Sequence, residues 1–292
     1  MENKIKEIEI KNLRRFEGNP FEIREDEAFI ELQKSIDENG IIVPIIVIPT
    51  EKENEFEIIS GNRRVEAARR IGLETIPADI QNLSRDEAVI TLVDCNISQR
   101  DLLPSEKAFG YKLKHDALKH QGKSDVHLQT TSGQNVPKSD SRRSASIIGE
   151  ENGDSYKTVQ RLIRLTYLNP DLLKLVDEGR MAMGPAVEIS YLPDEYQQLI
   201  SSVYEEEEVT PSYSQSVEMK KLFSEGELKE EKLRDILSRE KPNQKEMIRL
   251  PAEKFSKFFK GKASPKQTED FILRACEYYA RYLQRQKNRD VR

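Results

Sequence analysis

The sequence predicts an α+β protein in which a small α/β domain is followed by two helical regions. Two observations lead to this prediction. Before Pro104, short apolar runs such as 43–48 alternate with helical patterns, whereas after it only helical periodicity remains. We therefore expect an α/β domain over 1–103, an all-α domain over 104–210 and a helical C-terminal region over 211–292.

The expected elements of the first region follow one another closely. Residues 5–10 alternate like a strand, and residues 26–39 follow a helical period that stops at Gly40. The near-continuous apolar run over 43–48 is typical of a buried strand. The remaining expected elements are a strand over 56–59, a helix over 63–71, a short strand over 76–80 and a helix over 86–97.

The segment in which a strand leads into a glycine turn and then a helix is the most informative local feature. Gly61 follows the strand over 56–59, and Arg63 and Arg64 open the next helix. A helix N-terminus presents unpaired N–H groups, glycine permits close approach, and guanidinium groups match phosphate geometry. This pattern favours an anion site, with phosphate as the best match. The alternative is a surface turn with two solvated arginines.

The middle region has the outline of a helix-turn-helix. A helix is predicted from Pro104 to about Lys119, and the polar stretch 122–143 is predicted to be an inserted loop. The outline is completed by a short helix over 144–148, a turn over 149–154, and a helix over 156–165 that Ser155 caps. The expected turn is longer than in most such motifs.

Polar side chains of the second helix are candidates for DNA contacts, because they can hydrogen-bond base edges and phosphates. The alternative is an ordinary amphipathic surface helix. Two arginines just before the first short helix could contact phosphates or solvate the loop. The candidate set is Arg142, Arg143, Ser155, Tyr156, Lys157, Thr158, Gln160, Arg161 and Arg164.

The C-terminal region is charged and helical by pattern, with helices expected over 247–259 and 267–284. An apolar and aromatic stripe on the last helix includes Phe271, Tyr278 and Tyr282. We expect this stripe to be a dimer face. The alternative is packing within a small domain of its own.

Composition narrows the classes of function. The net charge of −5 argues against a nucleic-acid-binding protein whose whole surface is basic, but not against one with a local basic face. No apolar run reaches the roughly 18 residues of a membrane span, and the N-terminus lacks a signal-peptide core. Two distant cysteines fit a reducing cytoplasm, and three scattered histidines do not suggest a zinc site.

Three motifs occur in a fixed order along the chain. They are Gly40-Ile41-Ile42-Val43-Pro44-Ile45, then Gly61-Asn62-Arg63-Arg64-Val65-Glu66-Ala67-Ala68, then Asn96-Ile97-Ser98-Gln99-Arg100 followed by Pro104-Ser105-Glu106. In this order and spacing the chain resembles the ParB family of DNA partition proteins over roughly residues 5–200. The resemblance implies a helix-turn-helix that binds a centromere-like DNA site as a homodimer, and a ParA-type ATPase as partner. It also implies a cytoplasmic protein associated with a nucleoid or plasmid.

The resemblance further implies a pocket for CTP, with magnesium as a candidate companion whose ligands are unknown. Asn62 and Cys95 stand where the family usually has Glu, so hydrolysis is doubtful while binding is still expected. We expect Cys95 to be a small buried side chain. The positions implied for the nucleotide are Gly40, Pro44, Ile45, Gly61, Asn62, Arg63, Arg64 and Asn96.

Two other readings stay open. A transcriptional regulator could use the same DNA-binding domain without segregating DNA, and a less favoured reading is a CTPase or nuclease. The related sulfiredoxin chemistry is not supported, since the arginine motif lacks a cysteine. The polar insertion and the altered motifs look more like a plasmid or mobile-element relative.

Overall fold

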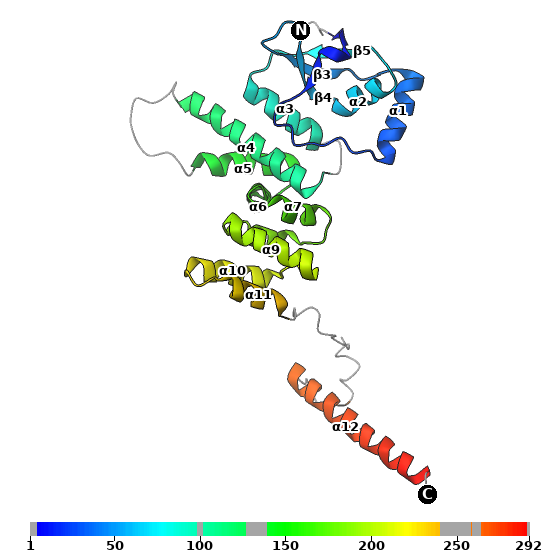
Figure 1. The fold of residues 1–292 in the computed structure, drawn as a ribbon, viewed down its shortest axis with the longest axis vertical. Coiled ribbons are helices and arrows are strands. Elements are labelled where there is room, and N and C mark those ends of the chain that lie inside the picture. The colour runs from blue at the N-terminus through cyan, green and yellow to red at the C-terminus, as the bar shows by residue number, and fades with distance from the viewer. Residues whose placement is uncertain (1–4, 98–101, 127–138, 240–257, 259–263, 291–292) are drawn as a thin grey trace. The chain divides into compact units, whose positions relative to one another are not determined.

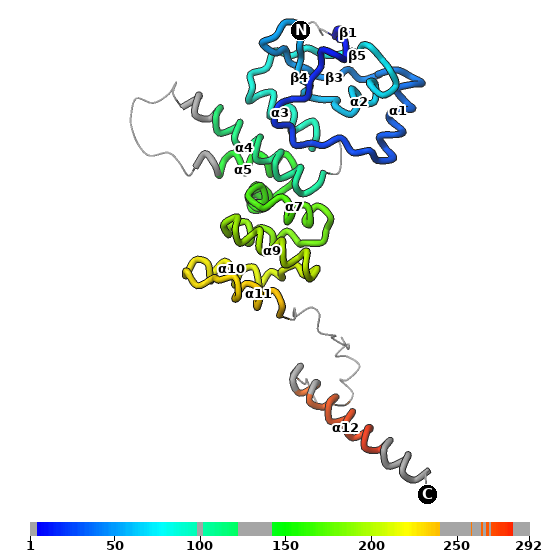
Figure 2. The backbone as a smooth tube through the Cα atoms, in the orientation of Figure 1, coloured from blue at the N-terminus to red at the C-terminus, as the bar shows by residue number. Residues whose placement is uncertain are grey.

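The computed structural model describes residues 5–97, 102–126, 139–239, 258 and 264–290 (Figure 1). Figure 2 traces the same backbone. The central part of the predicted polar loop, 127–138, and nearly all of the helix predicted over 247–259 lie outside the described residues. Backbone contacts divide the chain into residues 1–239 and 240–292.

The N-terminal domain is built on a mixed sheet with the strand order β1-β5-β3-β4-β2. The β1–β5 and β3–β4 pairs are antiparallel, whereas β3–β5 and β2–β4 are parallel. The strands are β1 (Ile5–Glu9), β2 (Leu13–Arg15), β3 (Ile45–Pro49), β4 (Phe56–Ser60) and β5 (Thr75–Ile80), with a 3-10 turn over Ile10–Asn12. Sequence analysis missed β2 because three residues with one buried side chain leave no periodic signal.

Helices cover both faces of this sheet (Figure 1). Ile58 and Ile59 of β4 belong to different buried clusters, as alternation along a strand requires. Ile58 packs with Val65 of α2 (Asn62–Arg70), and Ile59 packs with Leu92 of α3 (Arg85–Ile97). The anion-site segment predicted from sequence therefore connects β4 to the helix that covers one face of the sheet.

The helix predicted over 26–39 is present as α1 (Glu27–Asn39). The Asp26 carboxylate caps it by accepting a 2.8 Å hydrogen bond from the Phe29 amide. Gly40 ends it with a φ of 68°, a conformation that favours glycine.

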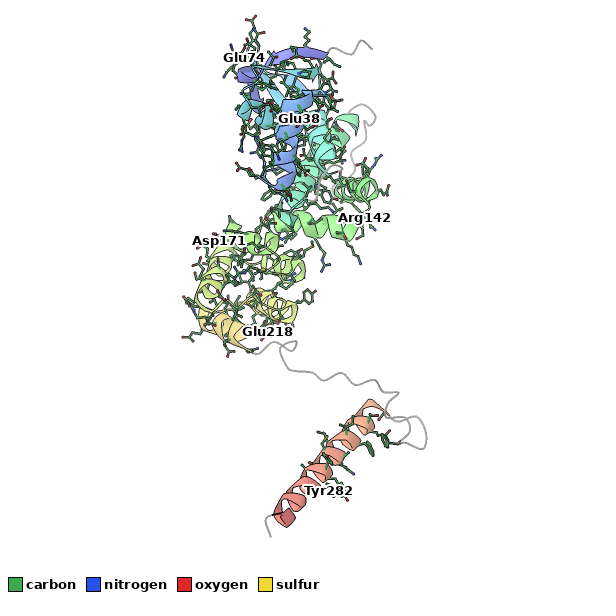
Figure 3. The ribbon with its side chains drawn as sticks, turned by 90° about the vertical axis from the view of Figure 1, so that its right-hand side faces the viewer. Glu38, Glu74, Arg142, Asp171, Glu218 and Tyr282 are labelled. Atoms are coloured by element: carbon green, nitrogen blue, oxygen red, sulfur yellow. The ribbon has the colours of Figure 1, made fainter. Side chains whose placement is uncertain are left out.

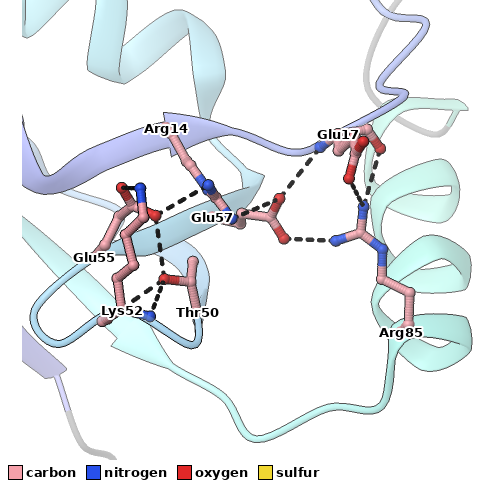
Figure 4. A network of polar contacts seen from close by, with 7 residues as sticks. All are labelled: Arg14, Glu17, Thr50, Lys52, Glu55, Glu57 and Arg85. Carbon is pink, nitrogen blue, oxygen red and sulfur yellow. Dashed lines mark hydrogen bonds and ion pairs between the residues drawn. The ribbon is translucent and has the colours of Figure 1, made fainter.

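One polar network fixes α3 against the sheet (Figure 4). Glu57 on β4 is only 5% exposed, and a buried carboxylate needs partners. It receives a 2.5 Å hydrogen bond from Arg85 Nη1 and lies 3.7 Å from Arg14 Nη2. The Arg85 guanidinium also lies 3.7 Å from the centroid of the Phe16 ring.

The described residues between 104 and 239 form eight helices, α4 to α11. A single buried cluster runs from Ala108 on the first of these helices to Leu237 on the last. The compact unit therefore continues past residue 210, where the C-terminal region was expected to begin. The helices are α4 (Pro104–Val126), α5 (Ser139–Asn152), α6 (Tyr156–Leu165), α7 (Pro170–Asp177), α8 (Met183–Ile189), α9 (Asp194–Glu207), α10 (Tyr213–Ser224) and α11 (Glu230–Ser238).

The helix-turn-helix is tighter than predicted. The expected turn over 149–154 is wrong, because α5 continues to Asn152 and α6 begins at Tyr156. Gly149 does not end the helix: a Cβ there would lie 2.5 Å from the carbonyl oxygen of Asp154. This glycine therefore permits close packing of the turn on α5.

The bounds predicted for the polar loop over 122–143 are also wrong at both ends. The first helix, α4, extends beyond residue 119 to Val126, and α5 starts at Ser139. Arg142 and Arg143 consequently lie on a helix and not in the loop.

In residues 240–292 the structure describes α12 (Pro265–Asp290), which includes the helix predicted over 267–284. Tyr278 on this helix is 76% exposed, and Phe271 stacks on Phe258 with 5.6 Å between ring centroids. Tyr282 is also exposed (Figure 3). Among the helices that the structure describes, none is both long and apolar enough to cross a membrane.

Candidate functional site

A pocket of about 300 Å³ opens where β4 meets α2. It brings the second and third sequence motifs together, although Gly61 and Asn96 are far apart in the chain. The lining residues are Phe21, Glu22, Ile23, Ala28, Leu32, Ser60, Gly61, Asn62, Arg63, Arg64, Cys95 and Asn96.

Gly61 shapes the floor of this pocket. It is the N-cap of α2 and has a φ of 104°, which side chains rarely permit. A Cβ at this position would lie 2.6 Å from Ile45 Cγ2. The glycine therefore lets the α2 N-terminus, with its free amide groups, sit directly on β3.

Arg63 is positioned by α1. Its Nη2 donates a 2.6 Å hydrogen bond to Oδ1 of Asp26, the carboxylate that also caps α1. Its Nε is buried and has no hydrogen-bond partner among the residues that the structure describes. Buried donors are nearly always satisfied in proteins, so an open one at the rim of a pocket suits a bound acceptor such as phosphate.

Arg64 connects the second motif to the first. It donates hydrogen bonds to the carbonyl oxygens of Val43 and Pro44, the latter at 2.9 Å. Burial lowers its pKa from the usual arginine value, although the nearby Cys95 acts in the opposite direction. Pro44 and Ile45 therefore border the site through Arg64 and Gly61, whereas Gly40 ends α1 and is not among the lining residues.

The α3 side of the pocket is contributed by Cys95 and Asn96. Asn96 Nδ2 donates to the carbonyl oxygen of Leu92 at 2.8 Å, which leaves its amide oxygen for other contacts. Cys95 is half-buried and lines the pocket, so the expectation of a small buried side chain is wrong. Asp94 is not part of the lining and is bonded to Lys114.

The lining suits phosphate groups better than a metal ion held by protein ligands. Among the described lining residues the one carboxylate belongs to Glu22, which is paired with Arg15 at 3.2 Å. Asn62 and Asn96 add only neutral amide oxygens, and magnesium prefers carboxylates with water or phosphate. Among the described residues, no three His, Cys, Asp or Glu side chains gather in a way that could hold a metal.

Sequence reasoning missed the wall formed by Phe21, Glu22 and Ile23. This wall is an extended segment with no periodicity, so only the fold reveals it. Glu106 at the start of α4 holds the segment in place: its Oε1 accepts a 3.0 Å hydrogen bond from the Glu22 amide, and its carboxylate also binds Arg24. Glu106 belongs to the third motif, which thus supports the pocket wall as well as the α3 side.

The turn between α5 and α6 is fixed by Asp154. Its Oδ2 accepts a 2.5 Å hydrogen bond from the Tyr111 hydroxyl and lies 2.7 Å from Lys107 Nζ. Burial raises the pKa of Asp154, but the bonds from Lys107 and Tyr111 outweigh it and hold that pKa below its usual range. Burial, reinforced by Asp154, raises the pKa of Tyr111.

Helix α6 has one buried and one exposed face. Ser155 caps it as predicted, accepting a 3.1 Å hydrogen bond from the Thr158 amide. The predicted residues Lys157, Gln160 and Arg161 are all exposed. The buried face is formed by Val159, Leu162 and Leu165.

Two predicted arginines on α5 extend this basic face. Arg142 and Arg143 are exposed, and the Arg142 guanidinium lies 5.6 Å from the Tyr156 ring centroid (Figure 3). Tyr156 in turn accepts a 2.6 Å hydrogen bond from Gln160 Nε2. The two helices therefore present cations and amide groups on a shared surface.

Two predicted residues are already engaged within the protein. Thr158 shares a 2.8 Å hydrogen bond with the Ser155 hydroxyl. Arg164 is half-buried and donates from Nε to Ser190 Oγ at 3.0 Å and from Nη2 to the Ser190 carbonyl oxygen. Arg164 thus joins α6 to the end of α8.

Comparison with known proteins supports the resemblance seen in the motifs. Residues 1–97 match the family model of the ParB N-terminal domain. The chain is 32% identical over 189 residues to the Stage 0 sporulation protein J of Bacillus subtilis, covering 63% of this chain and 56% of that protein. It is 28% identical over 226 residues to a probable chromosome-partitioning protein ParB of Vibrio cholerae, covering 77% and 68%. The chain thus spans only a little over half the length of the Bacillus relative.

The solved structures that match the chain include two of a truncated chromosome-partitioning protein ParB from Caulobacter crescentus. One is a complex with the centromeric parS site, with 21% identity, 80% of this chain and 98% of that chain covered, and a TM-score of 0.40. The other is a complex with CTP-gamma-S, with 24% identity, 68% and 97% coverage, and a TM-score of 0.31.

Proposed function

We propose that this chain, whose residues 1–97 form a ParB N-terminal domain, is a sequence-specific DNA-binding partition protein. The observation that supports this best is the capped helix α6, which presents Lys157, Gln160 and Arg161 to solvent. These side-chain types read base edges in the major groove. Relatives named as chromosome-partitioning proteins point to the same role.

The decisive experiment is to map the DNA that the protein occupies in its host. A partition protein should occupy a few centromere-like sites, and its removal should cause loss of the replicon that carries them. Occupancy of promoters, with altered transcription and unaffected inheritance, would favour the transcriptional regulator instead.

We also propose that the pocket between α1, α2 and α3 binds a nucleotide, with CTP as the first candidate. The unpaired Nε of Arg63, the α2 N-terminus behind Gly61 and the amide oxygen of Asn96 supply complementary groups for a triphosphate. CTP itself is suggested by the motif resemblance. Calorimetry with CTP, ATP, GTP and UTP tests both binding and base preference.

Self-association through α12 completes the proposal. Tyr278 is 76% exposed and Tyr279 is 60% exposed, which is unusual for large aromatic side chains and suits burial against a second copy. Palindromic DNA sites favour two-fold proteins. Sedimentation of Tyr278→Ser with Tyr279→Ser should show a monomer if α12 dimerises the chain. A ParA-type ATPase is the proposed partner, testable by stimulation of its ATPase activity.

A further inference from the structure

Five side chains from four parts of the helical region form a continuous row, which we call the cation–aromatic ladder. Lys112 Nζ lies 4.6 Å from the Tyr167 ring centroid, and the Arg164 guanidinium lies 4.7 Å from the same ring. Arg164 is also 4.0 Å from the Tyr191 ring, whose centroid lies 3.8 Å from Lys220 Nζ. Three cations are thus interleaved with two aromatic rings.

The ladder lies at the surface. Tyr167 is 54% exposed and Tyr191 is 45% exposed, and neither hydroxyl is hydrogen-bonded to a residue that the structure describes. The cations are held over ring faces, so little side-chain entropy is left to lose when they bind a ligand.

The ladder is also electrostatically unbalanced. Three positive groups converge, yet the one ion pair that they form within the described part of the chain is between Lys220 and Glu188, at 2.7 Å. Like charges brought together repel one another, so an anionic ligand would stabilise this arrangement. Arginine, lysine and tyrosine are among the residues that most often bind DNA phosphates.

The position of the ladder relative to α6 identifies the anion. Lys157, Gln160, Arg161 and Arg164 recur at helical spacing, so they share one face of the helix. Seven residues separate Lys157 from Arg164, a rise of roughly 10 Å. Arg164 lies one turn beyond Arg161, at the C-terminal end of α6, so a ladder that extends from this end onto neighbouring helices lies toward the phosphates at the edge of the groove that α6 enters.

We propose that the cation–aromatic ladder binds the phosphate backbone of duplex DNA beside the groove that α6 enters. This inference rests on the proposed DNA-binding function and extends its surface from the helix-turn-helix to α4, the turn after α8, and α10. It gives Arg164 a different task from Arg161: Arg161 reads bases, whereas Arg164, anchored on Ser190, holds the two tyrosines at the backbone.

The test measures how the affinity for a labelled random-sequence duplex depends on salt, because each phosphate contact contributes about 0.9 to the slope of log K against log salt. Lys220→Gln should weaken binding and reduce the slope by about that amount. Lys221→Gln is the matched control: it is the next residue on α10, its side chain is 72% exposed, and it pairs with Glu225 at 3.8 Å. It should leave the slope unchanged.

Two further variants separate DNA contact from a merely structural role. Glu188→Gln removes the carboxylate that competes for Lys220 and should strengthen binding to the random duplex. Tyr191→Phe keeps the ring and the packing but loses the hydroxyl, and it should weaken all sequences alike without lowering the melting temperature.

The outcomes distinguish this inference from the proposed function. If Lys220→Gln and Lys221→Gln show the same salt slope, while the wild type still binds DNA through Arg161, the ladder is not a phosphate site. The proposed DNA-binding function would stand in that case. Failure of the wild type to bind any duplex would overturn both.

Discussion

Arg63 on α2 and Asp26 at the start of α1 are joined by a 2.6 Å hydrogen bond, which fixes the guanidinium at the pocket, while its Nε has no partner in the part of the chain that the structure describes. A phosphate that binds there would find an arginine already oriented. Such preorganisation lowers the entropic cost of binding.

Arg63→Gln should therefore abolish CTP binding, measured by calorimetry, while the melting temperature changes little. Arg69→Gln is its control, since Arg69 lies on the same helix, is 53% exposed and pairs with Glu66 at 2.9 Å. Neither Arg69 nor Glu66 is among the residues that line the pocket. If no nucleotide binds the wild type at millimolar concentration, the pocket assignment is wrong.

The structure also shows which variants would mislead. Gly61→Ser would place a Cβ 2.6 Å from Ile45 Cγ2, so it should destabilise the domain and not only block the ligand. Arg64 holds the Val43 and Pro44 carbonyl groups, so its removal should disturb the loop before β3 as well.

A second prediction concerns DNA recognition. Arg161→Ala should remove the discrimination between the cognate site and random duplex, at a cost of about 1–3 kcal/mol for the specific complex. Arg142→Ala should weaken both duplexes alike and lower the salt slope, because a phosphate contact carries no sequence information. Fluorescence anisotropy with both duplexes measures this. Unchanged discrimination in Arg161→Ala would show that α6 is not the reader.

A third prediction concerns acid stability. The pKa of Asp154 is lower in the folded protein than its usual value near 4, so its stabilising effect is present above that pH and is lost as the pH falls through the folded pKa. Asp154→Asn should lower the free energy of unfolding by about 1–3 kcal/mol at neutral pH, because buried Tyr111 then loses a charged acceptor.

Urea unfolding at neutral and at acidic pH provides the measurement. The difference between Asp154→Asn and the wild type should shrink on acidification, since both side chains are then uncharged. A difference that stays constant with pH would mean that the carboxylate charge at the turn does not contribute to stability.

Local patterns were sufficient to predict the strands of the sheet other than β2, the capped helices and the arginine motif of the pocket. Each of these has a signal within a few residues: alternation in β1, Ser155 before α6, and Gly61 before α2. Features that depend on tertiary packing could not be predicted in this way. The 21–23 wall has no period, and it becomes part of the site only because Glu106 holds it there.

The error at Gly149 has the same origin. Glycine usually signals the end of a helix, but here it is required because the backbone of Asp154 packs against α5. The engagement of Arg164 by Ser190 was equally invisible, since 26 residues separate them.

The last prediction concerns nucleotide turnover. Asn62 and Cys95 both line the pocket, at positions where a carboxylate would bind magnesium or place the attacking water. Asn62 carries no charge and a thiol is a soft ligand, while the nearby acid Asp94 is bonded to Lys114 and is absent from the lining. General-base catalysis alone typically contributes about 10²–10⁴ in rate. Wild-type release of phosphate from CTP should therefore stay at background even with cognate DNA, so that a bound nucleotide would act as a long-lived gate.

Asn62→Glu combined with Cys95→Glu should raise the release of phosphate. The control, Asn62→Gln combined with Cys95→Gln, matches the size of these side chains without the charge and should not raise it. Robust DNA-stimulated release by the wild type would show that another acid, with Glu22 the first to examine, supplies the missing function.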